Sequence, residues 1–143
     1  MRCSFVVYSK AAPQGSKRFL GKGVMVESSK RVKPFRQDVR YAALDSIPED
    51  WPMDKPMRVH YRFHFKRPSS HLTTKGNLTK SAPLHPTGRN VGDIEKLARA
   101  VSDALSGVAF TDDSQVIEMR LEKSYDDRDL VVVTIEPVHH SQD

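Results

Sequence analysis

Residues 57–66 limit the fold more than any other part of the chain. Their sequence, MRVHYRFHFK, alternates apolar residues with Arg, His or Lys at every position. Successive side chains of a β-strand point to opposite faces, so an extended conformation places the apolar groups on one face and the basic or titratable groups on the other. The pattern therefore predicts a strand whose apolar face is buried against a hydrophobic core.

The basic face of this strand has two interpretations. It is either the solvated side of an antiparallel sheet, which commonly carries polar residues, or a surface that contacts a polyanion. Residues 55–92 contain eight Lys or Arg and no acid, whereas residues 93–143 contain twelve acids and five Lys or Arg. Such segregation is expected of a protein that grips nucleic acid and places carboxylates against it, which favours the second interpretation.

The rest of the 143-residue chain alternates between strand and helix patterns. Strands are expected at 4–8, 115–123 and 130–136, a short hairpin at 19–28 turning at Gly21-Lys22-Gly23, and helices from Pro34 to before Pro48 and from Asp93 to Gly107. The last two strands are expected to pair as a hairpin. We therefore predict one α+β domain over residues 1–143, with a mixed sheet and two main helices in the order β-ββ-α-β-α-β-β.

Residues 67–90 show neither helix nor strand periodicity and are rich in Ser, Thr, Pro and Gly. Loops of this length inside a compact domain are usually functional or disordered. We expect a mobile basic loop with two equal interpretations. Lys75, Lys80 and Arg89 would let it wrap a phosphate backbone and become ordered on binding, or it is a mobile insertion without a role.

Composition excludes several classes of protein. Cys3 is the only cysteine, which rules out an internal disulfide and a thiol-rich zinc site. No apolar run is long enough for the core of a signal peptide or for a membrane span. We expect a soluble protein of the cytoplasm of a bacterium or a phage-infected cell, with no membrane partner.

Carboxylates gather at both ends of the second helix. Asp93 and Glu95 open it, and Asp112 and Asp113 precede the next strand. On a helix Asp93 and Glu95 would lie on opposite flanks, so they can share an ion only if Asp93 lies in the preceding loop, where Gly92 gives the backbone freedom. Mg²⁺ prefers a few carboxylates, several waters and a substrate phosphate. The spacing thus indicates a Mg²⁺ site, with Asp112 as a fourth candidate ligand.

Structural roles explain the same residues without chemistry. Asp93 could cap the helix, and Asp112-Asp113 could be a plain turn. Glu95 could pair with Arg99 at i, i+4, and Asp103 is expected to pair with Arg99 one turn back. The spacing alone leaves these alternatives open.

The run DIEKLARAVSDALSG, followed by FTDDSQV, resembles the RusA family of Holliday junction resolvases. The family signature is an Asp-x-Asp that opens a helix continuing to Asp-Ala-Leu, then Asp-Asp-x-Gln-Val before a strand. The early PQGSKR is similar to the Pro-rich, basic N-terminal segment of phage-borne members. Gly92 stands where the family often has Pro, Glu95 replaces an Asp, and Arg99 replaces an essential Lys. The last exchange matters because guanidinium forks across phosphate oxygens, whereas an ammonium is a point charge.

The resemblance implies a RusA-like fold and a homodimer that resolves four-way or other branched DNA in recombination, repair or phage DNA processing. It implies symmetric nicks that leave 5′-phosphate ends, with Mg²⁺ or Mn²⁺ bound by Asp93, Glu95 and Asp113. Arg99 and Lys96 would hold the scissile phosphate or stabilise its charge. Basic residues spread over three segments would grip the DNA: Lys17, Arg18, Arg58, Arg62, Lys66, Arg67, Lys75, Lys80 and Arg89.

Two other functions fit the sequence. The chain could be a non-catalytic basic α+β domain that binds structured DNA or RNA, with purely structural acids. It could also be a sequence-specific DNA-binding regulator that reads bases with Arg36, Gln37 and Arg40 of the first helix. Mg²⁺-dependent cleavage separates the enzyme from both.

Overall fold

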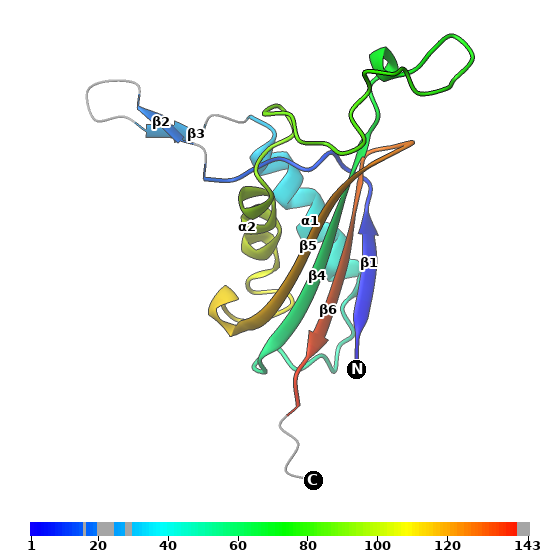
Figure 1. Cartoon of the computed structure of the whole chain (residues 1–143). Coiled ribbons are helices and arrows are strands. Elements are labelled where there is room, and N and C mark those ends of the chain that lie inside the picture. The colour runs from blue at the N-terminus through cyan, green and yellow to red at the C-terminus, as the bar shows by residue number, and fades with distance from the viewer. Residues whose placement is uncertain (16, 20–24, 28–29, 140–143) are drawn as a thin grey trace.

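A mixed four-stranded sheet forms the centre of the molecule (Figure 1). The structure, a computed structural model, describes residues 1–15, 17–19, 25–27 and 30–139. The strand order is β1-β6-β4-β5, and the strands are β1 (Cys3–Val7), β4 (Met57–Lys66), β5 (Val116–Asp126) and β6 (Leu130–Pro137). The order of elements along the chain is the predicted one, and the α+β fold class is confirmed.

Strand β4 has the predicted bounds, and all its apolar side chains are buried. It lies between β6, which is antiparallel to it, and β5, which is parallel. The predicted hairpin of the last two strands is therefore wrong, because β4 separates them. Alternation shows which side chains share a face but does not identify the neighbouring strand. A parallel pair requires a long crossover, which residues 67–115 provide.

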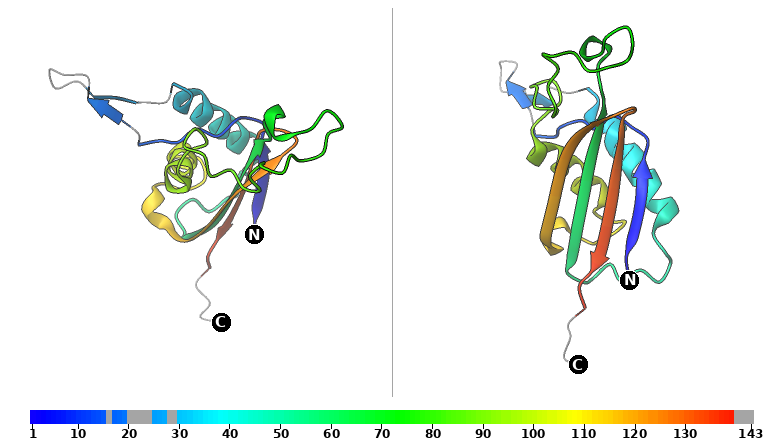
Figure 2. Two further views of the ribbon diagram at one scale, coloured as in Figure 1. Left: turned by 45° about the horizontal axis from the view of Figure 1, so that its top comes forward. Right: turned by 45° about the vertical axis from the view of Figure 1, so that its right-hand side comes forward.

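Two helices cover one face of the sheet (Figure 2). Helix α1 (Val32–Ser46) begins two residues before the predicted Pro34 and buries Val32, Phe35, Val39 and Ala43. Helix α2 (Ile94–Leu105) buries an apolar stripe that includes Leu97, Val101 and Leu105. Neither these nor any other helix among the described residues is long and apolar enough to cross a membrane.

The other face of the sheet carries the even-numbered side chains of β4 and their neighbours on the flanking strands. No helix of the described ranges lies over it (Figure 2). We call this surface the open face. It includes the basic side of β4 that the sequence assigns to DNA.

The predicted N-terminal hairpin is present as β2 (Lys17–Phe19) paired with β3 (Met25–Glu27). Its turn at Gly21-Lys22-Gly23 lies outside the described residues. The side chains of Lys17 and Arg18 are also outside the described part, so their contact with DNA stays a prediction.

The long loop has a defined path in which Arg67 is an anchor. Its guanidinium donates to the carbonyl oxygen of Pro83 at 2.7 Å and lies 4.3 Å from the ring centroid of Tyr125 on β5. A short 3₁₀ helix, η1 (Ser69–His71), follows it. These contacts occupy Arg67 within the protein, whereas Lys75 and Lys80 of the loop are exposed.

Candidate active site

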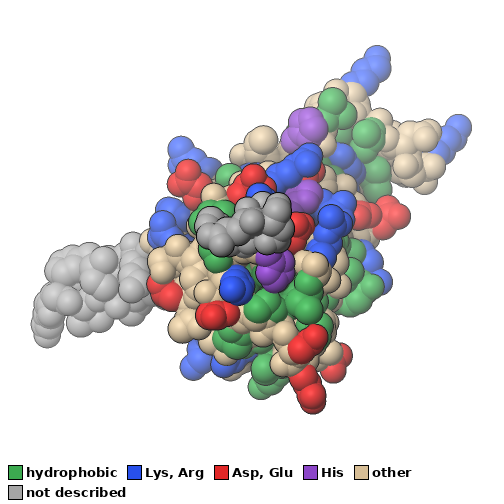
Figure 3. Space-filling model, turned by 90° about the horizontal axis from the view of Figure 1, so that it is seen from below, with side chains coloured by type: hydrophobic (Ala, Val, Ile, Leu, Met, Phe, Trp, Pro, Cys, Tyr) green, Lys and Arg blue, Asp and Glu red, His purple; other side chains and the backbone are tan. Residues whose placement is uncertain are grey.

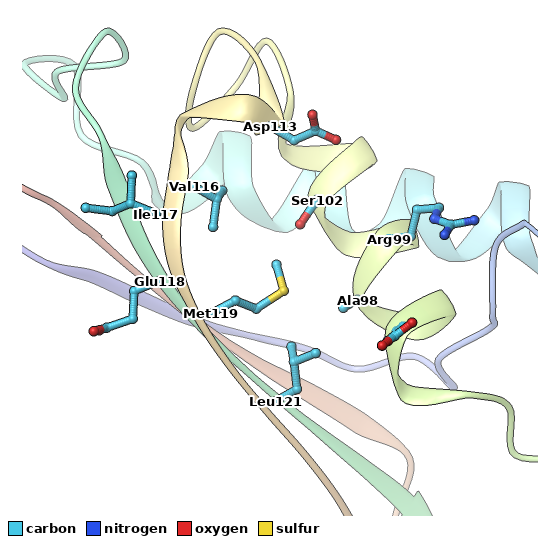
Figure 4. A pocket seen from close by; sticks show the side chains of 10 residues that line it. Ala98, Arg99, Ser102, Asp113, Val116, Ile117, Glu118, Met119 and Leu121 are labelled. Carbon is cyan, nitrogen blue, oxygen red and sulfur yellow. The ribbon is translucent and has the colours of Figure 1, made fainter.

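A groove of about 380 Å³ lies between α2 and the first half of β5 (Figure 4). Glu95, Arg99 and Ser102 line it from the helix, at spacings of four and three residues that place them on one helical face. Asp113 and the start of β5 line the opposite side. The groove thus brings Glu95 and Asp113 from two elements to one hollow, as the sequence predicted for two of the three ligands.

Beneath the groove, a buried hydrogen bond joins the sheet to the helix. The hydroxyl of Tyr61 on β4 lies 2.9 Å from Oγ of Ser102 on α2, and both residues are buried. Burial raises the pKa of Tyr61 far above its usual range, and the nearby charge of Asp113 acts in the same direction. Tyr61 therefore stays protonated and holds the helical wall of the groove in place.

Asp93 does not face this groove. It is the N-cap of α2, with extended backbone, and its carboxylate accepts a hydrogen bond from the backbone N–H of Glu95 at 2.9 Å. The prediction that Asp93 precedes the helix is confirmed, as is the capping alternative. Gly92 has the positive φ, +105°, that the predicted backbone freedom requires.

The side chain of Asp93 lines a second hollow of about 340 Å³, which we call the Asp93 cavity. Arg89, Lys96 and Lys123 line the same cavity. The first turn of α2 separates it from the groove, in keeping with the opposite flanks that the helical geometry predicts for Asp93 and Glu95.

The described residues contain no cluster of three or more carboxylate, imidazole or thiol side chains that could hold a metal ion. The three-carboxylate ligand set expected from the sequence is therefore not assembled. Glu95 and Asp113 still fit Mg²⁺, which is often bound by one or two carboxylates together with waters and substrate phosphate. Asp93 is not among the residues that line the groove with them.

Asp112 has the turn role that the sequence left open. It caps the short 3₁₀ helix η2 (Asp113–Gln115), and its carboxylate accepts hydrogen bonds from Ser114. These bonds lower the pKa of Asp112 below its ordinary value. The side-chain amide of Gln115 donates hydrogen bonds to the carbonyl oxygens of Met53 and Lys55, at 2.7 and 2.8 Å. These bonds fix the turn that carries Asp113.

Arg99 lines the groove, and its guanidinium lies beside Gly15 of the N-terminal segment. A Cβ atom on Gly15 would come within 2.2 Å of Nη1 of Arg99, and Gly15 has a φ of +96°. The same segment is fixed to α2 by a 2.9 Å hydrogen bond from the backbone N–H of Gln14 to the carbonyl oxygen of Lys96. Gly15 therefore leaves the space in which the guanidinium lies.

The prediction of an ion pair between Arg99 and Asp103 is wrong. Asp103 instead lies 3.9 Å from Arg36 of α1 and 3.4 Å from the side-chain amide of Gln14. Neighbours on one helix predict the pair, but α1 and the N-terminal segment bring competing donors to Asp103 from elsewhere in the chain.

Some basic side chains of the open face form ion pairs with acidic side chains of neighbouring strands. Arg58 lies 3.4 Å from Glu118 of β5 and 3.8 Å from Glu136 of β6, and His64 lies 3.0 Å from Asp126. At the end of the sheet, side chains of both signs are interspersed (Figure 3). Of the predicted DNA contacts on β4, Arg62 and Lys66 form no ion pair within the described ranges.

Sequence reasoning missed Ser102 and Lys123. Ser102 follows Arg99 at helical spacing on the same face, a signal that was present in the pattern. Lys123 continues the strand face of Met119 and Leu121, so it is a cation at the end of an apolar row. Its ammonium donates to the carbonyl oxygen of Gly92 at 3.0 Å, a contact that depends on how β5 crosses the start of α2.

Two comparisons relate this chain to known proteins. The family model of the endodeoxyribonuclease RusA matches residues 9–136, a range that includes the groove and the Asp93 cavity. The uncharacterized protein YqaN of Bacillus subtilis (strain 168) is 30% identical over 139 residues, which are 94% of this chain and 95% of YqaN.

Proposed function

Because this chain belongs to the RusA endodeoxyribonuclease family, we propose that it is a Mg²⁺-dependent nuclease that resolves four-way DNA junctions. The observation that carries the proposal is the groove that Glu95, Arg99 and Asp113 share. The two carboxylates can bind a metal ion and the neighbouring guanidinium can bind a phosphate, a combination that suits metal-assisted hydrolysis of a phosphodiester.

Glu95 and Asp113 would hold the ion, and Asp93 would join them if its side chain turned toward the groove. A bound Mg²⁺ supplies an activated water and offsets the charge that develops on the phosphate oxygens. Mn²⁺ takes oxygen ligands of the same kind and is the alternative ion. The exchange of the family's Asp for Glu95 lengthens the side chain by one methylene.

Arg99 would bind the phosphate that is cut. Its planar guanidinium can donate two parallel hydrogen bonds to phosphate oxygens. Gly15 leaves space for this group beside the helix, and the hydrogen bond of Gln14 keeps the N-terminal segment in place. Lys96 faces the Asp93 cavity rather than the groove, so it would act from the other side of the first turn.

Two symmetric nicks require two sites, and each chain contains one such groove among its described residues. A working resolvase would therefore be a closed twofold dimer whose axis coincides with that of the junction. Each nick would leave a 5′-phosphate and a 3′-hydroxyl.

The decisive experiment incubates the protein with a labelled synthetic four-way junction and Mg²⁺. A parallel EDTA sample tests the need for metal, and a linear duplex of the same sequence tests the need for the junction. We expect paired cuts of the junction only in the presence of metal. A protein that binds the junction but never cuts it would instead be a non-catalytic binder of structured DNA or RNA.

A further inference from the structure

The Asp93 cavity contains more positive than negative charge. Arg89 of the long loop, Lys96 of α2 and Lys123 of β5 line it, and Asp93 is the only acid among its lining residues. Within the described part of the chain, none of the three cations forms an ion pair. Three elements that are distant in sequence therefore converge on a hollow that favours an anion.

Lys123 is held in position within this cavity. Its ammonium donates to the carbonyl oxygen of Gly92 at 3.0 Å. The side chain of Pro13 also packs against Gly92, because a Cβ on Gly92 would come within 2.9 Å of it. The backbone at Gly92 therefore has protein atoms close to its Cα. An ammonium has three donors, and the bond to Gly92 uses one, which leaves two for a ligand.

The negative charge of Asp93 does not cancel these cations. One of its carboxylate oxygens accepts the N–H of Glu95 in the helix cap, and no cation forms an ion pair with it among the described residues. The first turn of α2 lines both hollows, with Lys96 at the cavity and Glu95 at the groove. A DNA strand that lies over this turn would reach both hollows.

We propose that the Asp93 cavity binds a backbone phosphate that flanks the phosphate cut in the groove, with Lys123 as its fixed cation. This inference rests on the proposed function, because it takes DNA as the substrate. It assigns to Lys123 and Arg89 a role in placing the strand, separate from the hydrolysis at Glu95 and Asp113.

The salt dependence of DNA binding tests this proposal without any cleavage. Binding to the junction is measured in EDTA over a series of salt concentrations for wild type, Lys123→Met and Lys96→Met. Each lost phosphate contact is expected to reduce the slope of log K against log salt by about one. Lys123→Arg should retain the wild-type slope. The matched control is Lys33→Met, which removes an exposed lysine of α1 and should also leave the slope unchanged.

A neutral methylphosphonate, placed in turn at each linkage around the cut, locates the phosphate. One flanking linkage should weaken binding of wild type but not of Lys123→Met. An unchanged slope in Lys123→Met would overturn the proposal. If Lys123→Met also loses thermal stability, the role of Lys123 is only to stabilise the backbone at Gly92. If Lys123→Met does not fold, the salt dependence of binding is measured with Lys96→Met and Arg89→Gln instead.

Wild-type protein that shows these slopes but never cuts the junction would refute the proposed resolvase activity and would leave the proposed phosphate site unaffected.

Discussion

Both sides of the sheet carry cations, and the two sides differ in which of these cations lie close to acids. Arg58 of the open face lies near both Glu118 and Glu136, whereas Lys96 and Lys123 have no ion-pair partner among the described residues. A phosphate that approaches Arg58 must compete with carboxylates already in place. A basic strand is therefore a poor guide to a DNA-binding surface until the residues on its neighbouring strands are known.

The largest expected effect concerns the groove. Asp113→Asn and Glu95→Gln should each reduce junction cleavage by more than about 100-fold, because loss of even an outer-shell partner of a metal ligand costs about 10- to 100-fold. Binding should be retained or become tighter, since less negative charge then repels the phosphate. Single-turnover cleavage and a gel-shift assay in EDTA measure the two effects.

Asp112→Asn is the control for this pair of substitutions, because Asp112 caps a turn and should keep nearly full cleavage. Full activity of Asp113→Asn would remove Asp113 from the site. In that case the groove would no longer support the proposed chemistry.

The second prediction concerns Asp93, whose carboxylate either stays in the cap or moves to the metal. Asn is about as good an N-cap as Asp, so Asp93→Asn should leave thermal stability nearly unchanged. Cleavage should still fall by about tenfold or more if the carboxylate binds the ion. Titration of activity with Mg²⁺ measures this, since a lost ligand raises the concentration needed for half-maximal rate. Wild-type cleavage by Asp93→Asn would show that Asp93 is only a cap.

The contrast between the groove and the open face also shows what a sequence can reveal. The alternation in β4 and the apolar stripe of α2 are local and strong, so both elements were predicted close to their observed bounds. The separation of Asp93 from Glu95 also follows from helical geometry alone. The contact of Lys123 with Gly92 and the pairing of β5 with β4 depend on tertiary packing between segments far apart in the chain, which periodicity does not encode.

The third prediction compares one arginine from each side. Arg89→Gln in the Asp93 cavity should reduce the slope of log K against log salt by about one, whereas Arg58→Gln should change it by less than about half a unit. The difference arises because Arg58 is already paired with Glu118 and Glu136.

Replacing Arg58, Arg62 and Lys66 together by Ser tests the open face as a whole. The sequence alone predicts a slope reduced by up to about three units, one for each phosphate contact. A reduction of that size would mean that the open face grips DNA after all. It would reverse the comparison between the two sides.

The smallest expected effect is a pH dependence on the open face. A hydrogen bond with His60 lowers the pKa of Glu122 below its ordinary value, and the charge of Arg120 acts in the same direction. A carboxyl whose pKa is lowered by folding stabilises the folded state above its unfolded pKa, and this contribution is lost as the pH falls through the folded pKa. The effect is small because 44% of the Glu122 side chain is exposed to solvent.

Glu122→Gln should therefore show a slightly shallower loss of thermal stability than wild type below about pH 5. Thermal unfolding followed by circular dichroism at a series of pH values measures the difference. Glu49→Gln, which replaces an exposed acid after α1, is the control and should follow the wild-type curve. If Glu122→Gln also follows that curve, the pair of His60 and Glu122 does not stabilise the open face.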